Sequence, residues 1–292
     1  MSCVILPSFC ALCGSPLPQF FLAPICNACW SEFPAQSGPS CLRCGDTLDA
    51  PALASGLAAN SESLGLCRRC RMVPPPFVRA VAYGLYHDRM KAAIHALKYE
   101  HLHPAARVLG QMLALAIAQL APEAPLEMLV VPVPLHRVKH AERGFNQARA
   151  LAEQALASLR KTHPEWKLKL AASTLMRLRA TTSQAGLSMH QRRVNVRGAF
   201  SVSNSALVDS KHILIIDDIF TTGATARATA QALVRAGAAS VWVATLARAR
   251  RVSEYGYTRA LQDEDKAEVT TYGTPARLQQ ESNYSSHDQP SF

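Results

Sequence analysis

The chain has 292 residues, of which 49% are hydrophobic, so it is long and apolar enough for one ordinary domain and a small second one. Its formal net charge of +10 favours a polyanionic partner or a phosphorylated ligand, although a merely soluble basic surface is the alternative. Residues 1–7 lack the features of a secretion signal, and the apolar stretch 105–121 is too short and too polar to span a bilayer. We therefore expect a cytoplasmic protein without membrane insertion.

The N-terminal region is dominated by cysteine. All nine cysteines lie in the first 70 residues, and eight of them form four Cys-x-x-Cys pairs. In a chain without a secretion signal, this crowding indicates metal binding rather than disulfides. The eight residues are Cys10, Cys13, Cys26, Cys29, Cys41, Cys44, Cys67 and Cys70.

These pairs also form an internal repeat. The first pair of each unit is followed by glycine, at Gly14 and Gly45, which suits a turn that needs a positive φ. Four thiolates bind Zn²⁺ tetrahedrally, so the repeat predicts two structural zinc ions in a double zinc-ribbon module over residues 8–71. Sequential pairing is favoured and interleaved pairing stays open, while dithiol redox chemistry is the alternative for any single pair. Residues 50–65 have the composition of a loop insertion.

Beyond Pro74-Pro75-Pro76, which predicts a stiff linker, strands alternate with helices. This alternation predicts an α/β domain over residues 77–250, with a parallel sheet and flanking helices. From residue 253 to residue 292 the chain is polar and acidic, which predicts a disordered tail. The expected elements are strand 78–86, helix 87–99, helix 104–121, strand 127–133, helix 143–162, strand 212–216, helix 223–236 and strand 240–246.

A basic loop follows the strand 127–133. Residues 131–147 carry several cations, and the loop precedes a helix, so it should lie at the carboxyl edge of the sheet. Such a loop could bind the pyrophosphate of a ligand, and the candidate residues are Arg143, Gly144 and Asn146. A solvated basic loop is the alternative.

The segment 184–200 lies between two predicted sheet strands and has mixed periodicity with several cations. It predicts a mobile lid over the active edge, which would exclude water from a reactive sugar. A surface loop on a basic protein explains the same composition.

The most informative segment is residues 213–225, Ile-Leu-Ile-Ile-Asp-Asp-Ile-Phe-Thr-Thr-Gly-Ala-Thr. An apolar strand ends at the adjacent carboxylates Asp217 and Asp218, and a small hydroxyl-rich turn then opens a helix. Ligands of open α/β sheets bind outside the carboxyl ends of strands. A helix N-terminus suits a phosphate, whereas carboxylates repel one and suit sugar hydroxyls or a Mg²⁺-bound group. The pattern therefore predicts a ribose 5-phosphate site, with the phosphate on Thr221, Thr222, Gly223, Ala224 and Thr225.

This run resembles the phosphoribosyl pyrophosphate (PRPP) loop of the type I phosphoribosyltransferases. A larger set of motifs, in order, resembles the ComF family of bacterial competence proteins over roughly residues 8–250. The set comprises the cysteine pairs, Leu97-Lys98-Tyr99, Pro132-Val133-Pro134-Leu135-His136, Arg143-Gly144-Phe145-Asn146-Gln147, Gln184-Ala185-Gly186-Leu187, Asn195-Val196-Arg197-Gly198-Ala199-Phe200 and the Asp217-Asp218 loop.

The resemblance implies a zinc ribbon joined to a type I phosphoribosyltransferase-like domain that binds PRPP with Mg²⁺. It also implies a role in handling single-stranded DNA during natural transformation, with a DNA-translocating helicase as partner. One departure narrows the chemistry, because relatives that salvage 6-oxopurines carry aspartate where this chain has Thr221. A hydroxyl is a poor proton acceptor at neutral pH, so this substitution argues against hypoxanthine or guanine as substrate.

Two functions from different classes fit these features. An enzyme would transfer the phosphoribosyl group to an acceptor that the sequence does not name, with Asp217 and Asp218 as catalytic residues and pyrophosphate as product. A non-catalytic module would use the same fold to sense a nucleotide or to bind single-stranded DNA through its basic surface.

Overall fold

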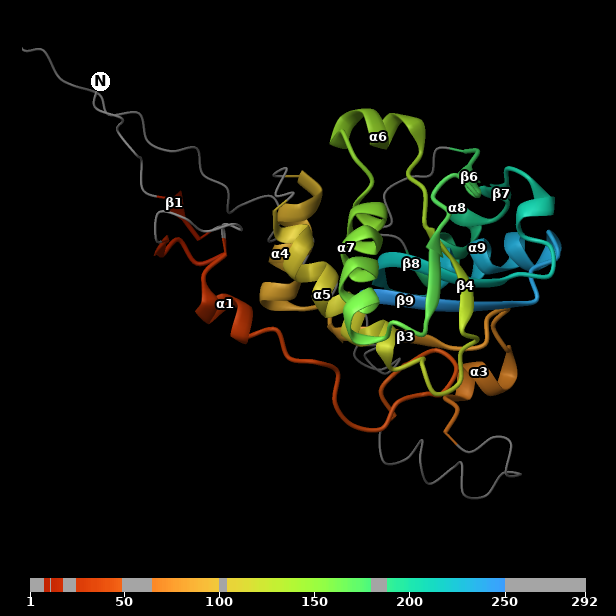
Figure 1. Ribbon diagram of the computed structural model, residues 1–292, viewed down its shortest axis with the longest axis horizontal. Coiled ribbons are helices and arrows are strands. Elements are labelled where there is room, and N and C mark those ends of the chain that lie inside the picture. The colour runs from red at the N-terminus through yellow and green to blue at the C-terminus, as the bar shows by residue number, and fades with distance from the viewer. Residues whose placement is uncertain are drawn as a thin grey trace, which may run out of the picture. The chain divides into compact units, whose positions relative to one another are not determined.

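The computed structural model describes residues 8–10, 12–17, 25–48, 65–99, 104–179 and 188–249 (Figure 1). The chain divides into two units, Met1–Arg251 and Val252–Phe292. The predicted tail, most of the predicted insertion 50–65 and the motif at residues 184–187 lie outside the described residues. Among the described residues, no helix has the length and apolar character needed to cross a bilayer.

A parallel sheet forms the centre of the first unit, as the alternation of strands and helices predicts. Its strand order is β3-β9-β8-β4-β5, and every neighbouring pair is parallel. The strands are β3 (Ala80–Leu85), β4 (Glu127–Pro132), β5 (Lys167–Leu170), β8 (His212–Phe220) and β9 (Ser240–Arg248).

Helices cover both faces of this sheet, so the inner strands are apolar on both sides. Leu214 and Ile216 of β8 join the core on the face covered by α4 (Asp88–Tyr99), α5 (Ala105–Ala118) and α7 (Gln147–Thr162). Ile213 and Ile215 point to the other face and pack with α9 (Ala224–Arg235). The short antiparallel pair β6 (Leu175–Arg177) and β7 (Phe200–Val202) also belongs to this second core.

The cysteine-rich segments pack against the same sheet. Their elements are β1 (Ser8–Phe9), β2 (Pro16–Leu17), α1 (Asn27–Ser31) and α3 (Arg68–Met72). Cys10 and Cys29 of the first repeat lie in the core with α4 and α5, whereas the four cysteines of the second repeat lie in the core with α9. The two repeats therefore support opposite faces of the sheet, and both fall in the unit Met1–Arg251.

Three remaining elements lie near the carboxyl edge of the sheet or beside α9. They are α6 (Arg137–Arg143), α8 (Met189–Val196) and the 3₁₀ turn Ser205–Leu207. A capping box formed by Ser188 and Gln191 begins α8 within the segment that was predicted to be a lid.

Two predicted boundaries are wrong. The strand predicted over 212–216 continues to Phe220, because β9 supplies backbone partners along the extra residues. The helix predicted over 143–162 begins only at Gln147, as α7. Residues 137–143 of the predicted basic loop form a separate helix, α6, which ends where Gly144 adopts a left-handed φ of 72°. The edge strand β5 and the β6–β7 pair were not predicted.

The connections place a topological switch between β4 and β8. The chain passes from β4 through α7 to β5 at one edge, and from β8 through α9 to β9 in the opposite direction. The loops after β4 and β8 consequently diverge, and such a point is where ligands bind in open α/β sheets. The carboxylates and the basic loop meet at this position.

Gly110 allows α5 and α7 to pack closely (Figure 1). A Cβ at this position would lie 2.3 Å from Gln154 Cβ and 3.2 Å from the Ala155 backbone nitrogen. Alanine is the better helix former by about 1 kcal/mol, but this overlap would force the helices apart. We expect Gly110→Ala to lower the free energy of unfolding by about 1–3 kcal/mol, as measured by urea denaturation.

The matched control is Leu115→Ala, on the exposed side of the same helix. It should change the free energy of unfolding by no more than about 0.5 kcal/mol. Stabilisation by Gly110→Ala would contradict the close packing of α5 on α7.

Candidate functional site

The carboxylate pair, Asp217 and Asp218, lies on β8 beyond the end of β4. Pairing of β4 with β8 ends at Pro132 and Ile216. On the other side, β8 remains paired with β9 through Asp217–Thr245, Ile219–Ala247 and Phe220–Arg248. The backbone of the carboxylate pair is therefore held by β9 on one side and faces the open switch point on the other.

Lys98 forms the closest charged contact of this pair. Its Nζ atom lies 2.6 Å from Asp218 Oδ2, and the two side chains are only 19% and 15% exposed. The Asp218 backbone N–H donates to Asp217 Oδ1 over 2.9 Å. One lysine thus neutralises one of two adjacent carboxylates in a poorly hydrated position.

The two carboxyl groups titrate in opposite directions. Burial and the neighbouring Asp218 charge raise the pKa of Asp217 to about 8. Burial acts on Asp218 as well, but the Lys98 ammonium outweighs it and holds the pKa of Asp218 below its usual value. Burial would lower the pKa of Lys98, yet Asp218 outweighs this effect and raises it. Near neutral pH, Asp218 carries the charge and Asp217 holds a proton in the ligand-free protein.

The phosphate loop, residues 221–225, connects β8 to α9. Gly223 has a left-handed φ of 74° and is the N-cap of α9, and a Cβ there would lie 2.6 Å from the Phe220 ring. Thr222 is buried, and its Oγ1 accepts from the Ala224 N–H over 3.3 Å. A cavity of about 10 Å³ lies between this loop, Asp217 and Thr245. It has room for about one water and is too small for a phosphate.

The three predicted pyrophosphate residues differ in their placement. Arg143 ends α6 and donates to Gln147 Oε1 over 3.2 Å, and Gly144 follows as the left-handed cap. Asn146 is the N-cap of α7, and its Nδ2 donates to the Val133 carbonyl over 3.0 Å. Its Oδ1 accepts from the Arg149 N–H, so both polar atoms of the Asn146 side chain help to join α7 to the end of β4.

Three further cations that were not predicted as site residues, Lys98, Lys139 and Arg177, surround the switch point. Burial together with Arg143 and Arg177 lowers the pKa of Lys139, and Lys98 contributes in the same direction. Burial and Arg143 also lower the pKa of Arg177, whose charge interacts favourably with Asp217. Lys98, Lys139, Arg143 and Arg177 therefore form one field of positive charge around the carboxylate pair.

The sequence signal for these cations is uneven. Lys98 stands in the motif Leu97-Lys98-Tyr99, which was noted without a role. Lys139 falls inside the predicted basic loop, whereas Arg177 comes from β6, which has no recognisable pattern. Contacts between distant segments, rather than local spacing, bring them together.

The cysteines form two groups that could each hold a metal ion. The first cysteine group is Cys10, Cys13, Cys26 and Cys29, and the second is Cys41, Cys44, Cys67 and Cys70. Within each group the sulfur atoms lie within 4.8 Å of one another. This confirms sequential grouping and contradicts the interleaved alternative.

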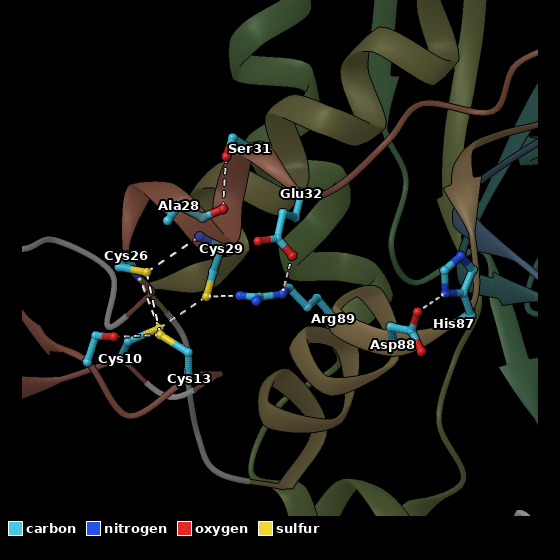
Figure 2. Close-up of polar contacts among 11 residues, drawn as sticks. Cys10, Cys13, Cys26, Ala28, Cys29, Ser31, Glu32, His87, Asp88 and Arg89 are labelled. Atoms are coloured by element: carbon cyan, nitrogen blue, oxygen red, sulfur yellow. Dashed lines mark hydrogen bonds and ion pairs between the residues drawn. The ribbon is translucent and has the colours of Figure 1, made fainter.

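Matching turns build the two groups. Gly14 donates its N–H to the Cys10 carbonyl over 2.8 Å and Gly45 donates to Cys41 over 2.7 Å, with φ of 70° and 71°. The positive φ expected at these glycines is thus confirmed. Figure 2 shows the first group, where the Arg89 guanidinium of α4 lies between Cys29 Sγ and the Glu32 carboxylate.

Residues 141–272 match the family described as the phosphoribosyl transferase domain. The fold and the placement of the carboxylate pair define the same class, a type I phosphoribosyltransferase-like parallel sheet. A solved structure of glutamine PRPP amidotransferase from B. subtilis, complexed with ADP and GMP, covers 49% of this chain and 26% of its own, at 24% identity and a TM-score of 0.28. That likeness is too distant to carry an argument about function.

Curated relatives resemble most of the chain. The DNA utilization protein YhgH of Escherichia coli K12 is 34% identical over 244 residues, covering 83% of this chain and 97% of the relative. Competence protein F of Haemophilus influenzae is 27% identical, covering 77% and 90%, and competence protein ComFC of Bacillus subtilis is 26% identical, covering 82% and 94%. The chain belongs to the ComF family, which includes these DNA utilization and competence proteins.

The opposite pKa shifts give the two aspartates opposite effects on stability. In the folded protein Asp217 holds a proton up to a pH of about 8, whereas in the unfolded chain it releases that proton above a pH of about 4. The contribution of Asp217 to the free energy of unfolding therefore falls as the pH rises from about 4 to about 8. We expect Asp217→Asn to raise the free energy of unfolding at pH about 8 by about 1–2 kcal/mol. Guanidinium denaturation at several pH values measures the change.

Asp218→Asn is the matched comparison. It leaves the poorly hydrated Lys98 ammonium without its counter-ion, so we expect a loss of about 2 kcal/mol at neutral pH. Because the pKa of Asp218 is depressed, the contribution of Asp218 is present above its unfolded pKa and is lost on acidification. Equal effects of the two variants would contradict the asymmetric charge of the pair.

Proposed function

We propose that the chain binds PRPP together with Mg²⁺ at the switch point between β4 and β8. The observation that carries this proposal is the carboxylate pair held directly before a phosphate loop at that point. A ribose 5-phosphate needs hydroxyl acceptors beside an anion site, and few other small ligands need both. Asp217 and Asp218 would accept the two ribose hydroxyls.

The phosphate loop would bind the 5-phosphate. The backbone amides of Thr221, Thr222, Gly223, Ala224 and Thr225 open a helix of 12 residues, whose N-terminus favours an anion. Gly223 supports this role because its left-handed backbone and its contact with the Phe220 ring exclude a side chain. The loop and the carboxylates would thus hold opposite ends of the ribose phosphate.

The positive field around the carboxylate pair would bind the pyrophosphate. Arg143, Lys139 and Arg177 interact electrostatically with one another, and a multiply charged anion would relieve that repulsion. Gly144 would let the loop approach the anion, while Asn146 would hold the loop in position through its contact with Val133. Mg²⁺ would be bound mainly by pyrophosphate oxygens, as is usual for this ion.

The proposed reaction is phosphoribosyl transfer. The bond between the anomeric carbon and the pyrophosphate oxygen breaks, pyrophosphate departs with the electron pair, and an acceptor nucleophile forms the new bond to that carbon. The cations would stabilise the charge that develops on the leaving group. Thr221 offers no carboxylate for a purine base, which argues against 6-oxopurine acceptors.

We also propose that each cysteine group binds one structural zinc ion. The Sγ–Sγ distances of Cys10–Cys29, Cys13–Cys26 and Cys44–Cys67 are all 3.7 Å. A tetrahedron with zinc–sulfur bonds of about 2.3 Å has an edge of about 3.8 Å, so the donor sets fit zinc. Four protein ligands leave no open position, and these ions would stabilise structure without acting in catalysis.

We propose a cellular role in handling single-stranded DNA taken up by the cell, with a DNA-translocating helicase as partner, and the family membership supports the link to DNA. The relatives are named for competence and DNA utilization. The eight described cysteines form no disulfides, which is usual in a reducing compartment. We therefore place the proposed activity in the cytoplasm.

Calorimetric titration tests the ligand. Mg·PRPP should bind the wild-type chain, and the double variant Asp217→Asn, Asp218→Asn should bind at least about 100-fold more weakly, because amides replace both carboxyl acceptors of the ribose hydroxyls. The matched control is Glu165→Gln, which removes an exposed carboxylate between α7 and β5. This variant should bind Mg·PRPP as the wild type does. Absence of binding by the wild type, or full binding by the double variant, would contradict the proposal.

A second function, DNA binding without catalysis, is favoured by the net charge of +10. Fluorescence anisotropy with a labelled single-stranded oligonucleotide should show an affinity that falls steeply with salt, with a slope of about −0.7 per phosphate contact. The Asp217→Asn, Asp218→Asn variant should not lose this affinity, because carboxylates repel DNA phosphates rather than bind them. Loss of DNA and PRPP binding together would contradict two separate sites.

A further inference from the structure

The second cysteine group is more deeply buried than the first. All four of its cysteines are buried, whereas Cys13 of the first group is exposed. The segment that carries this group also contacts strand β3 directly. Ala80 at the start of β3 donates its N–H to the Arg43 carbonyl over 2.8 Å, and a Cβ on Gly45 would lie 2.7 Å from the Ala80 oxygen.

A buried arginine joins this group to the end of β9. Arg248 is only 2% exposed, and its guanidinium contacts the Cys44 carbonyl, the Cys44 sulfur at 3.6 Å and Asp46 at 3.4 Å. Zinc bound by four thiolates leaves excess negative charge on the sulfur atoms. A buried guanidinium needs such anionic partners, so its position depends on the thiolates that a bound metal maintains.

The same guanidinium stacks on the residue that precedes the phosphate loop. Arg248 Cζ lies 4.4 Å from the centroid of the Phe220 ring, in cation–π geometry. That ring also packs edge-on against Phe77, with centroids 6.2 Å apart. Gly223 also packs against the Phe220 ring, since a Cβ on Gly223 would lie 2.6 Å from it. A continuous chain of contacts therefore runs from Cys44 through Arg248 and Phe220 to Gly223.

A second contact ties the same region to α9. Arg227 donates to the carbonyls of Val73 and Pro74, which follow α3, over 3.1 and 3.4 Å. Arg227 lies one turn into the helix that the phosphate loop opens, and its N–H donates to the Gly223 carbonyl. The cysteine-rich segment thus holds both the strand end before the loop and the helix after it.

The first cysteine group offers a comparison within the same chain. Arg89 contacts Cys29 Sγ much as Arg248 contacts Cys44, but its other described partner is Glu32, in the same N-terminal repeat. Its group packs on the opposite face of the sheet. The described contacts of Arg89 therefore connect α4 to the first repeat and include no residue of the phosphate loop.

From these contacts we propose that metal binding by the second cysteine group positions the phosphate loop through Arg248 and Phe220. Arg248 is a positioning residue, since it touches Cys44 and Phe220 rather than a ligand. Metal binding at the second group and phosphate binding at the loop are then coupled, and by linkage each raises the affinity of the other. The coupling to PRPP rests on the function proposed above, whereas the support of the loop does not.

Hydrogen exchange tests the support of the loop without any ligand. In the zinc-loaded protein, Arg248→Met keeps the length of the side chain but removes its donors and charge. Backbone amides of residues 220–226 should exchange about fivefold faster or more, while α5 and α7 keep their protection. The matched control Arg89→Met should leave the loop unchanged. Unchanged exchange in Arg248→Met would overturn the proposal.

Should Arg248→Met fail to fold, Phe220→Leu takes its place. It keeps an apolar side chain beside Gly223 but removes the ring on which the guanidinium stacks, so the same amides should exchange faster. Protection of the loop equal to that of the wild type in this variant would likewise overturn the proposal.

Equilibrium competition with a zinc-selective chelator tests the coupling, and alkylation of released thiols identifies which group has lost its metal. Mg·PRPP should raise the zinc affinity of the second group by about fivefold or more and leave the first unchanged. Arg248→Met should abolish this effect and Arg89→Met should keep it. An equal effect on both groups, or none despite bound PRPP, would overturn the coupling. No PRPP binding at all would instead refute the proposed function, with the exchange experiment still deciding the role of Arg248.

Discussion

Two adjacent carboxyl groups at the end of β8 share one cationic partner, Lys98, and this is the constraint on which the rest of the site depends. Two adjacent carboxylates occupy a poorly hydrated position, and Lys98 balances only Asp218. The pair is tolerated because β9 holds the backbone on one side and a field of cations surrounds the other. Burial of Asp217 raises its pKa and lowers stability above neutral pH, and a ligand that binds both carboxyl groups would offset that loss.

The cysteine repeats connect the site to both faces of the sheet. Each repeat supports one face of the sheet, and the second reaches the phosphate loop through Arg248 and Phe220. The described cysteine-rich segments are consequently an integral part of the unit that forms the site. The arrangement explains how a small, loop-rich segment can affect the geometry of a distant helix N-terminus.

The local patterns of the sequence predicted the parallel sheet, the sequential cysteine groups and the position of the carboxylates. Those features depend on short-range signals, such as the apolar run 213–216 and the repeated Cys-x-x-Cys-Gly turn. The length of β8 was not predictable, since its last residues pair only because β9 lies beside them. The alternating Lys and Leu of strand β5 are a local signal from which this strand was predictable.

The charged partners of the site needed tertiary structure. Lys98 and Arg248 are far from Asp218 and Cys44 in sequence, and no local spacing indicates either contact. The structural contacts of Asn146 likewise needed the fold, because its bond to the Val133 carbonyl joins segments that local spacing does not connect. The placement of a polar group can follow from sequence, whereas its partners follow from the fold.

The most direct test of the central claim is a crystal structure of the complex with Mg·PRPP. The account predicts ribose hydroxyls on Asp217 and Asp218, the 5-phosphate on the amides of residues 221–225, and pyrophosphate among the cations at Lys139, Arg143 and Arg177. A ligand bound elsewhere, or a 5-phosphate away from the phosphate loop, would contradict the account.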